Sequence, residues 1–124
     1  MKVPTNTLID HTLDWAVAKC EEYKRIHIWT AWVNKHGAHG DIQIMVSNKK
    51  HECYAFNPTQ NWAQGGSIIE REKIAILYPP SGASQWRGTM GYGVQYGPTP
   101  LIAALRCYVA SKLGDEVEIP EKLT

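Results

Sequence analysis

The sequence predicts one α+β domain, in which an N-terminal helix, a C-terminal helix and a short middle helix pack a largely antiparallel sheet of about four to five strands. The 124 residues match the usual size of one domain, which buries about two-thirds of the surface exposed on unfolding. Helical apolar patterns occur near both ends of the chain, and short β-rich segments separated by turns lie between them. No repeat or linker divides residues 1–124, so one domain is expected.

The first half of the chain predicts a helix and three strands. The helix covers Asp10–Glu22, where apolar residues recur at the i, i+3, i+4 and i+7 spacing of a one-faced stripe. Those residues are Leu13, Ala16, Val17 and Cys20. The expected strands, rich in β-branched and aromatic residues, are Arg25–Val33, Asp41–Val46 and Glu52–Phe56. The last two are joined by a polar turn and form a predicted hairpin.

The middle of the chain predicts a short helix over Ile68–Lys73. Ser67 and Glu70 have the spacing of a capping box, in which each side chain satisfies a backbone N–H of the first turn. This interpretation places Gly65 and Gly66 in the loop before the helix. Further strands are expected at Ile74–Leu77 and Gln85–Thr89.

The last helix carries the clearest signals at both ends. Thr99 is a favoured N-cap residue, and Pro100 suits the first helical position. Gly114 supplies the C-cap, just after the cation Lys112. The segment Met90–Gly97 before this helix and the acidic tail after it receive no element.

Charge and cysteine content exclude several classes of protein. Thirteen Lys and Arg residues against twelve Asp and Glu residues give a net charge of +1, whereas duplex DNA binders usually show a clear basic excess. Neither a run of 18 or more apolar residues nor an apolar leader is present, so no membrane contact is expected. Cys20, Cys53 and Cys107 form no CxxC pair, which argues against disulfides and structural zinc. Cys20 and Cys107 are interpreted as small buried hydrophobes, and a reducing cytoplasm is expected.

The sequence shows no catalytic signature. It lacks the serine-elbow, HExxH and Walker A patterns, so no catalytic residue, cofactor or metal is expected. His36 and His39 are the only close histidine pair, and we interpret them as solvated side chains of a glycine-flanked loop.

Several stretches of the sequence are distinctive: residues 13–20, Asn57-Pro58, residues 61–74, and residues 96–109 continuing through 111–117. Together they resemble the phage NinX-like proteins. Ser67 stands where the family often has proline, and the segment Tyr23–Glu52 is longer than usual. The resemblance implies a phage or prophage origin and action in the cytoplasm of a bacterial host. It implies no reaction, because the family has no assigned chemistry.

Two predicted helix starts are suited to binding an anion, because the first turn of a helix has free N–H groups and a partial positive charge. One follows Gly65-Gly66-Ser67, and the other follows Tyr96-Gly97-Pro98-Thr99. Arg71 and Arg106 are candidate guanidinium forks for phosphate or carboxylate. The alternative is ordinary turn chemistry at the glycines and surface ion pairs at the arginines.

The aromatic residues point to a flat ligand. Five Trp and six Tyr accompany one Phe, and flat rings stack on nucleobases for about 1–3 kcal/mol per base. Trp62, Trp86 (with Arg87 beside it), Tyr92 and Tyr96 cluster around the two helix starts; the alternative for each is packing. The candidate ligand-binding residues are Asn57, Trp62, Gly65, Gly66, Ser67, Arg71, Trp86, Tyr92, Tyr96, Thr99 and Arg106.

The favoured hypothesis is a phage accessory protein that binds and sequesters a small nucleotide-derived immune signal of the host without catalysis, acting as a homo-oligomer. An alternative is a protein-interaction module that inhibits a host defence or recombination enzyme, since Trp, Tyr and Arg are enriched at binding hot spots. A second alternative is a binder of single-stranded nucleic acid, which the near-zero net charge disfavours.

Overall fold

A computed structural model describes residues 1–23, 25–30, 42–79 and 83–123. The helices of this part are α1 (Asp10–Cys20), α2 (Trp62–Glu72) and α3 (Pro100–Leu113), with single 3₁₀ turns η1 (Thr5–Thr7) and η2 (Glu121–Leu123). The strands are β1 (Lys2–Pro4), β2 (Arg25–Thr30), β3 (Ile42–Ser47), β4 (Cys53–Ala55), β5 (Ala75–Leu77), β6 (Trp86–Met90), β7 (Gly93–Gly97) and β8 (Glu116–Glu118). The α+β class is therefore confirmed. The loop of His36 and His39, and the end of the strand expected to reach Val33, lie outside the described residues.

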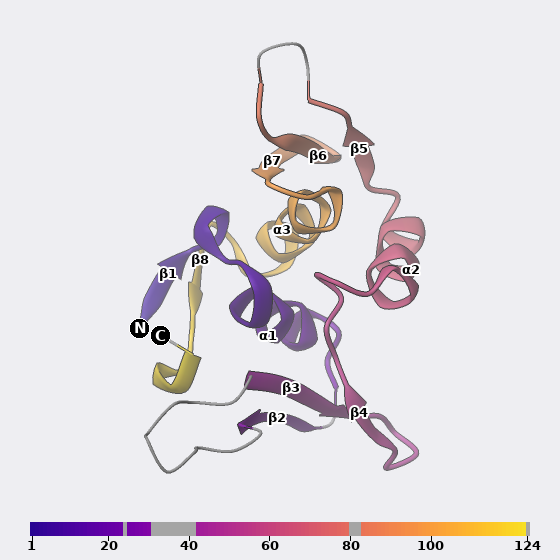
Figure 1. Ribbon diagram of the computed structural model, residues 1–124, viewed down its shortest axis with the longest axis vertical. Coiled ribbons are helices and arrows are strands. Elements are labelled where there is room, and N and C mark those ends of the chain that lie inside the picture. The colour runs from indigo at the N-terminus through magenta and orange to yellow at the C-terminus, as the bar shows by residue number, and fades with distance from the viewer. Residues whose placement is uncertain (24, 31–41, 80–82, 124) are drawn as a thin grey trace.

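The strands divide among three small antiparallel sheets. Their orders are β1-β8, β2-β3-β4 and β5-β6-β7. In Figure 1 the β5-β6-β7 sheet lies at one end of the molecule and the β2-β3-β4 sheet at the other, with α3 and α1 packed between them. The β1-β8 pair brings the two termini together, and the amino group of Met1 bonds the carboxylate of Glu118 at 2.8 Å.

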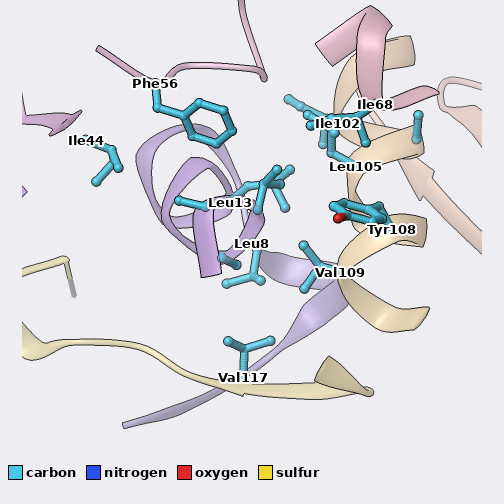
Figure 2. Packing of buried hydrophobic residues seen from close by; sticks show 14 of the residues in the cluster. Leu8, Leu13, Ile44, Phe56, Ile68, Ile102, Leu105, Tyr108, Val109 and Val117 are labelled. Carbon is cyan, nitrogen blue, oxygen red and sulfur yellow. The ribbon is translucent and has the colours of Figure 1, made fainter. Parts of the chain in front are cut away.

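Helix α3 is the centre of the core. Its residues from Leu101 to Val109 are all buried, because α1, α2 and the β5-β6-β7 sheet all contact it. This central position buries every side of the helix between these residues. Figure 2 shows the inner faces of the three helices meeting, with the labelled side chains of Leu13, Ile68, Ile102, Leu105 and Tyr108.

The β5-β6-β7 sheet rests directly on the backbone of α3. A Cβ atom at Gly88 of β6 would lie 2.8 Å from the carbonyl oxygen of Ala103, and one at Gly97 of β7 would lie 2.7 Å from the nitrogen of Ala103. Both distances are too short for any side chain. These two glycines therefore define the face of the sheet that α3 covers.

The prediction for the middle helix was wrong in its start. Helix α2 begins at Trp62, and the side chain of Asn61 caps it by accepting from the backbone N–H groups of Ala63 at 2.9 Å and Gln64 at 3.3 Å. Gly65 lies within the helix, where a Cβ would meet the carbonyl oxygen of Pro58 at 2.6 Å. The glycine serves close packing against the chain before α2, and local sequence rules cannot distinguish that use from a loop.

The capping role expected for Ser67 was wrong for the same reason. Its hydroxyl lies in the interior of α2 and donates to the carbonyl oxygen of Ala63, one turn earlier, at 2.7 Å. Three edge strands received no prediction. Gly93–Gly97 forms strand β7, and residues 116–118 of the acidic tail (β8) pair with Lys2–Pro4 (β1) at the N-terminus.

Candidate ligand-binding site

The face of the β5-β6-β7 sheet that points away from α3 is exposed. Successive side chains of a strand alternate between faces, so the residues next to Gly88 and Gly97 point outward. The register places Leu77 of β5 opposite Arg87 of β6, and Arg87 opposite Tyr96 of β7. Leu77 is 42% exposed and Tyr96 is 49% exposed. The apolar side chain of Leu77, the guanidinium of Arg87 and the phenol ring of Tyr96 thus form one row across the outer face.

A hollow of about 580 Å³ lies over this row. Small-molecule sites commonly fall between about 300 and 1,000 Å³. The described residues that line the hollow are Leu77, Tyr78, Ala83, Ser84, Gln85, Arg87 and Tyr96. The arrangement supplies a ring for stacking, one cation and a few polar side chains in one place.

Tyr78 lines the hollow and packs against Trp86, which is not among the lining residues. Their ring centroids lie 5.0 Å apart with the planes at 79°, an edge-to-face pair of the kind that aromatic quadrupoles favour. Tyr78 is 78% exposed, whereas Trp86 is half-buried. Trp86 therefore supports the ring of Tyr78.

Arg106 acts on this site from below the sheet. Its guanidinium is buried and donates from Nη1 to the carbonyl oxygen of Tyr96 at 2.7 Å and from Nε to that of Leu8 at 2.9 Å. Burial lowers the pKa of Arg106. The residue predicted as a ligand fork is instead placed to hold the backbone of β7.

Arg71 already holds carboxylates of the protein. Its Nη atoms bond both oxygens of Glu21 at 3.0 and 2.6 Å, and its Nε bonds Glu72 at 2.8 Å. Its Nη2 also bonds the hydroxyl of Tyr108 at 3.2 Å. The hydrogen bonds to Glu21 and Glu72 raise the pKa of Arg71. The fork predicted for a ligand thus joins the end of α1 to α2 and α3.

The two helix starts predicted to bind an anion are occupied by their own caps. At α2 the donors of the first turn bond Asn61, and the predicted Gly65-Gly66 loop does not exist. At α3 the Thr99 hydroxyl oxygen accepts from the N–H of Ile102 at 3.1 Å. Pro100 has no N–H, so little of that first turn remains for a phosphate.

The remaining candidate residues are dispersed. Trp62 is 56% exposed on the first turn of α2, where its ring lies 3.8 Å from the position of a Cβ on Gly66. The backbone N–H of Asn57 bonds the side chain of Gln64 at 2.7 Å. Tyr92 is fully exposed at the β6-β7 turn. Of the predicted set, Tyr96 lines the hollow, and Trp86 and Arg106 support it.

The prediction missed Leu77, Tyr78 and Gln85 and noted Arg87 only as the neighbour of Trp86. The signal that identifies the outward residues is the strand alternation around Gly88. This alternation can be used only when Gly93–Gly97 is known to be a strand. Gly88 of β6 and Gly97 of β7 together show which face of the sheet α3 covers.

A second hollow, of about 450 Å³, lies on the outer face of the β2-β3-β4 sheet. His27, Trp29, Met45 and Cys53 line it, and Trp29 is 54% exposed. None of the predicted ligand residues lines this second hollow, so the first is the stronger candidate site. Trp32, the other tryptophan of the predicted strand, lies outside the described residues.

The thiols of Cys20 and Cys107 do not line the hollow. Burial raises the pKa of the Cys20 thiol to about 12 and that of Cys107 to about 11, so these thiols stay protonated near pH 7, as expected of small hydrophobes. Within the described ranges, no His, Cys, Asp and Glu side chains gather into a group able to hold a metal ion. No helix there is long and apolar enough to cross a membrane.

Comparison with known proteins identifies the family. No curated protein matches the chain. The family model described as NinX of bacteriophage P22 matches residues 5–112, which is most of the chain and includes α1, α2, all of α3 but its last residue, and the candidate site. The resemblance seen in the sequence is therefore confirmed, and the chain belongs to the bacteriophage P22 NinX family.

Proposed function

We propose that this phage accessory protein binds and sequesters a small nucleotide-derived signal of the bacterial host without converting it, and that the hollow on the β5-β6-β7 sheet is its site. The observation that carries the proposal is the row of Leu77, Arg87 and Tyr96 beneath a hollow of ligand size. In this proposal the protein acts in the host cytoplasm as a homo-oligomer.

Each part of the row has a partner in a nucleotide. A base stacked on Tyr96 gains about 1–3 kcal/mol, and Leu77 supplies apolar contact. The guanidinium of Arg87 offers a planar fork for phosphate oxygens. Ser84 and Gln85 bring donors and acceptors for the edge of a base.

Retention without conversion agrees with the described lining. Catalysis of proton transfer relies on a positioned base or acid, most often His, and also Glu, Asp, Lys, Tyr or Cys. Of these types, the described lining residues of the hollow include two tyrosines, Tyr78 and Tyr96, and no His, Glu, Asp, Lys or Cys. The proposal therefore assigns the site to binding.

The test is to incubate the purified chain with cyclic and linear nucleotides, remove free ligand, release the bound fraction by heat and identify it. Recovery of unmodified nucleotide supports sequestration, and recovery of a converted product contradicts it. Tyr96→Ala should lose retention, whereas Tyr92→Ala, which removes an exposed ring outside the hollow, should keep it. Unchanged retention in both variants would place the ligand outside this hollow.

A second candidate is a protein-interaction module acting on a host enzyme. Val94 is 45% exposed and points to the same outer face as Leu77 and Tyr96, and contiguous apolar surface of this kind is typical of interfaces. In a pull-down from host lysate, this candidate expects one stoichiometric partner that remains after nucleotides are removed. Val94→Asp should release that partner and leave nucleotide retention intact.

The third candidate, binding of single-stranded nucleic acid, has one cation in the described lining to support it. It expects oligonucleotide binding that weakens steeply with added salt. Absence of binding at low salt would eliminate it.

A further inference from the structure

We infer that the ligand of the hollow carries a single anionic phosphodiester group beside its ring, as a cyclic mononucleotide does, and is not a triphosphate. This inference rests on the proposed function. It follows from counting the groups that could hold phosphate around the site.

The hollow has one charge among its described lining residues. Arg87 is that residue, and the others are apolar, aromatic or neutral polar. Its guanidinium can form two parallel hydrogen bonds, which match the two non-bridging oxygens of one phosphodiester. The described lining has no carboxylate to hold a divalent cation, the usual means by which proteins neutralise a polyphosphate.

The other cations of the predicted site are already engaged. Arg71 donates its fork to Glu21 and its Nε to Glu72. Arg106 lies under the sheet and donates to the carbonyl oxygens of Leu8 and Tyr96. Neither arginine is among the residues that line the hollow.

The helix starts offer no substitute. The first-turn donors of α2 bond Asn61, and Thr99 caps α3. Phosphate chains are commonly held by free N–H groups of this kind. A triphosphate would therefore present several negative charges to one guanidinium, and the extra phosphates would gain nothing over a diester.

The experiment is calorimetric titration of the full chain with adenosine, adenosine 3′,5′-cyclic monophosphate and adenosine triphosphate at pH 7, repeated with the guanosine series. We expect the cyclic monophosphate to bind about tenfold more tightly than the nucleoside, corresponding to about 1.4 kcal/mol for one charge-assisted pair. The triphosphate should bind no more tightly than the cyclic monophosphate.

Two variants assign the preference to Arg87. Arg87→Gln should equalise the affinities for nucleoside and cyclic monophosphate, while Arg25→Gln, which removes an exposed arginine from the β2-β3-β4 sheet, should leave the tenfold difference. Because Arg87 is exposed, an unchanged melting curve is expected and verifies that the variant is folded.

The outcomes separate this inference from the proposed function. Tighter binding of the triphosphate, or an unchanged preference in Arg87→Gln, overturns the single-charge inference and leaves nucleotide binding in place. Binding of the nucleoside and both nucleotides with equal affinity to the wild-type chain does the same. If no member of either series binds, the inference is overturned, and the proposed function falls with it only where the heat-release experiment also recovers no nucleotide.

Discussion

The guanidinium of Arg106 donates to the backbone carbonyl of Tyr96 at 2.7 Å, from helix α3 to edge strand β7. Tyr96 is the register partner of Arg87 on the neighbouring strand β6. A buried residue of the core therefore holds the backbone of the strand residue that carries the ring of the candidate site.

Replacing Arg106 should destabilise the fold and weaken the site together. Arg106→Met leaves the carbonyl oxygens of Leu8 and Tyr96 without their donors, and each unsatisfied buried acceptor costs about 1–3 kcal/mol. We expect a loss of about 2–4 kcal/mol in urea unfolding, and weaker ligand binding under conditions where the variant is still folded. A change below about 0.5 kcal/mol, the range of ordinary surface substitutions, would show that these hydrogen bonds carry little stability.

Asp14 should make stability depend on pH. Asp14 is 5% exposed, and burial raises the pKa of its carboxyl group from 3.8 to about 7, against the opposing hydrogen bond from the N–H of Thr59. Between about pH 4 and pH 7 the folded protein keeps the proton that the unfolded chain has released. Stability should therefore fall as pH rises through this window, by on the order of 3 kcal/mol.

Asp14→Asn is the matched control for this pH dependence. The amide keeps an oxygen that can accept from Thr59 and does not titrate. Urea midpoints of the variant between pH 4.5 and pH 7.5 should lose the downward slope seen for the wild type. A wild-type stability that rises over the same interval would contradict a raised pKa.

Arg71 should contribute to stability and not to ligand binding. Its fork joins Glu21, and Arg71 and Glu21 both bond the hydroxyl of Tyr108. Since Arg71 is half-exposed, screening limits the pair to about 0.5–1 kcal/mol, measured as the coupling in a double-mutant cycle of Arg71→Met and Glu21→Gln. Nucleotide retention should persist in Arg71→Met. If Arg71→Met lost nucleotide retention without losing stability, Arg71 would be a ligand-binding residue and the prediction would be wrong.

Two adjacent glycines of α2 should respond in opposite directions to alanine. Gly65→Ala places a Cβ 2.6 Å from the carbonyl oxygen of Pro58 and should destabilise the protein by about 1–3 kcal/mol. Gly66→Ala meets only the ring of Trp62 at 3.8 Å and should stabilise the helix by up to about 1 kcal/mol. Thermal melts of the two variants compare them directly. A ligand-binding loop at these glycines would instead lose binding in both variants while the melts changed little.

Local signals account for the parts of the fold that the sequence predicted. Helix α3 follows from Thr99, Pro100 and Gly114, each of which acts within its own turn. The β3-β4 hairpin follows from two short strands joined by a polar turn, and the side chain of Asn48 bonds the N–H groups of Lys50 and Glu52 in that turn. The early start of α2 also has a local cause, the Asn61 cap, which the stronger glycine signal concealed.

The site could not be predicted in the same way, because its residues are adjacent only across strands. Leu77, Arg87 and Tyr96 become neighbours through the pairing of three strands, and the strand carrying Tyr96 has a glycine-rich sequence typical of a turn. Arg71 and Arg106 look alike in the sequence as free forks. Their partners, Glu21, Leu8 and the carbonyl of Tyr96, come from distant elements.

By itself, the sequence determined the α+β class, the family, the last helix and an aromatic set rich in Trp and Tyr, because these depend on local propensity, periodicity and long stretches of matching residues. Only the tertiary structure decided which of those rings face solvent over a hollow and which arginine is free. Gly88 and Gly97 are the reason, because without side chains they allow the sheet to pack closely on α3. One face of the sheet is then covered and the other is exposed. Whether a ring is buried and whether an arginine has a partner depend on how the whole chain packs, so the residue types alone do not predict them.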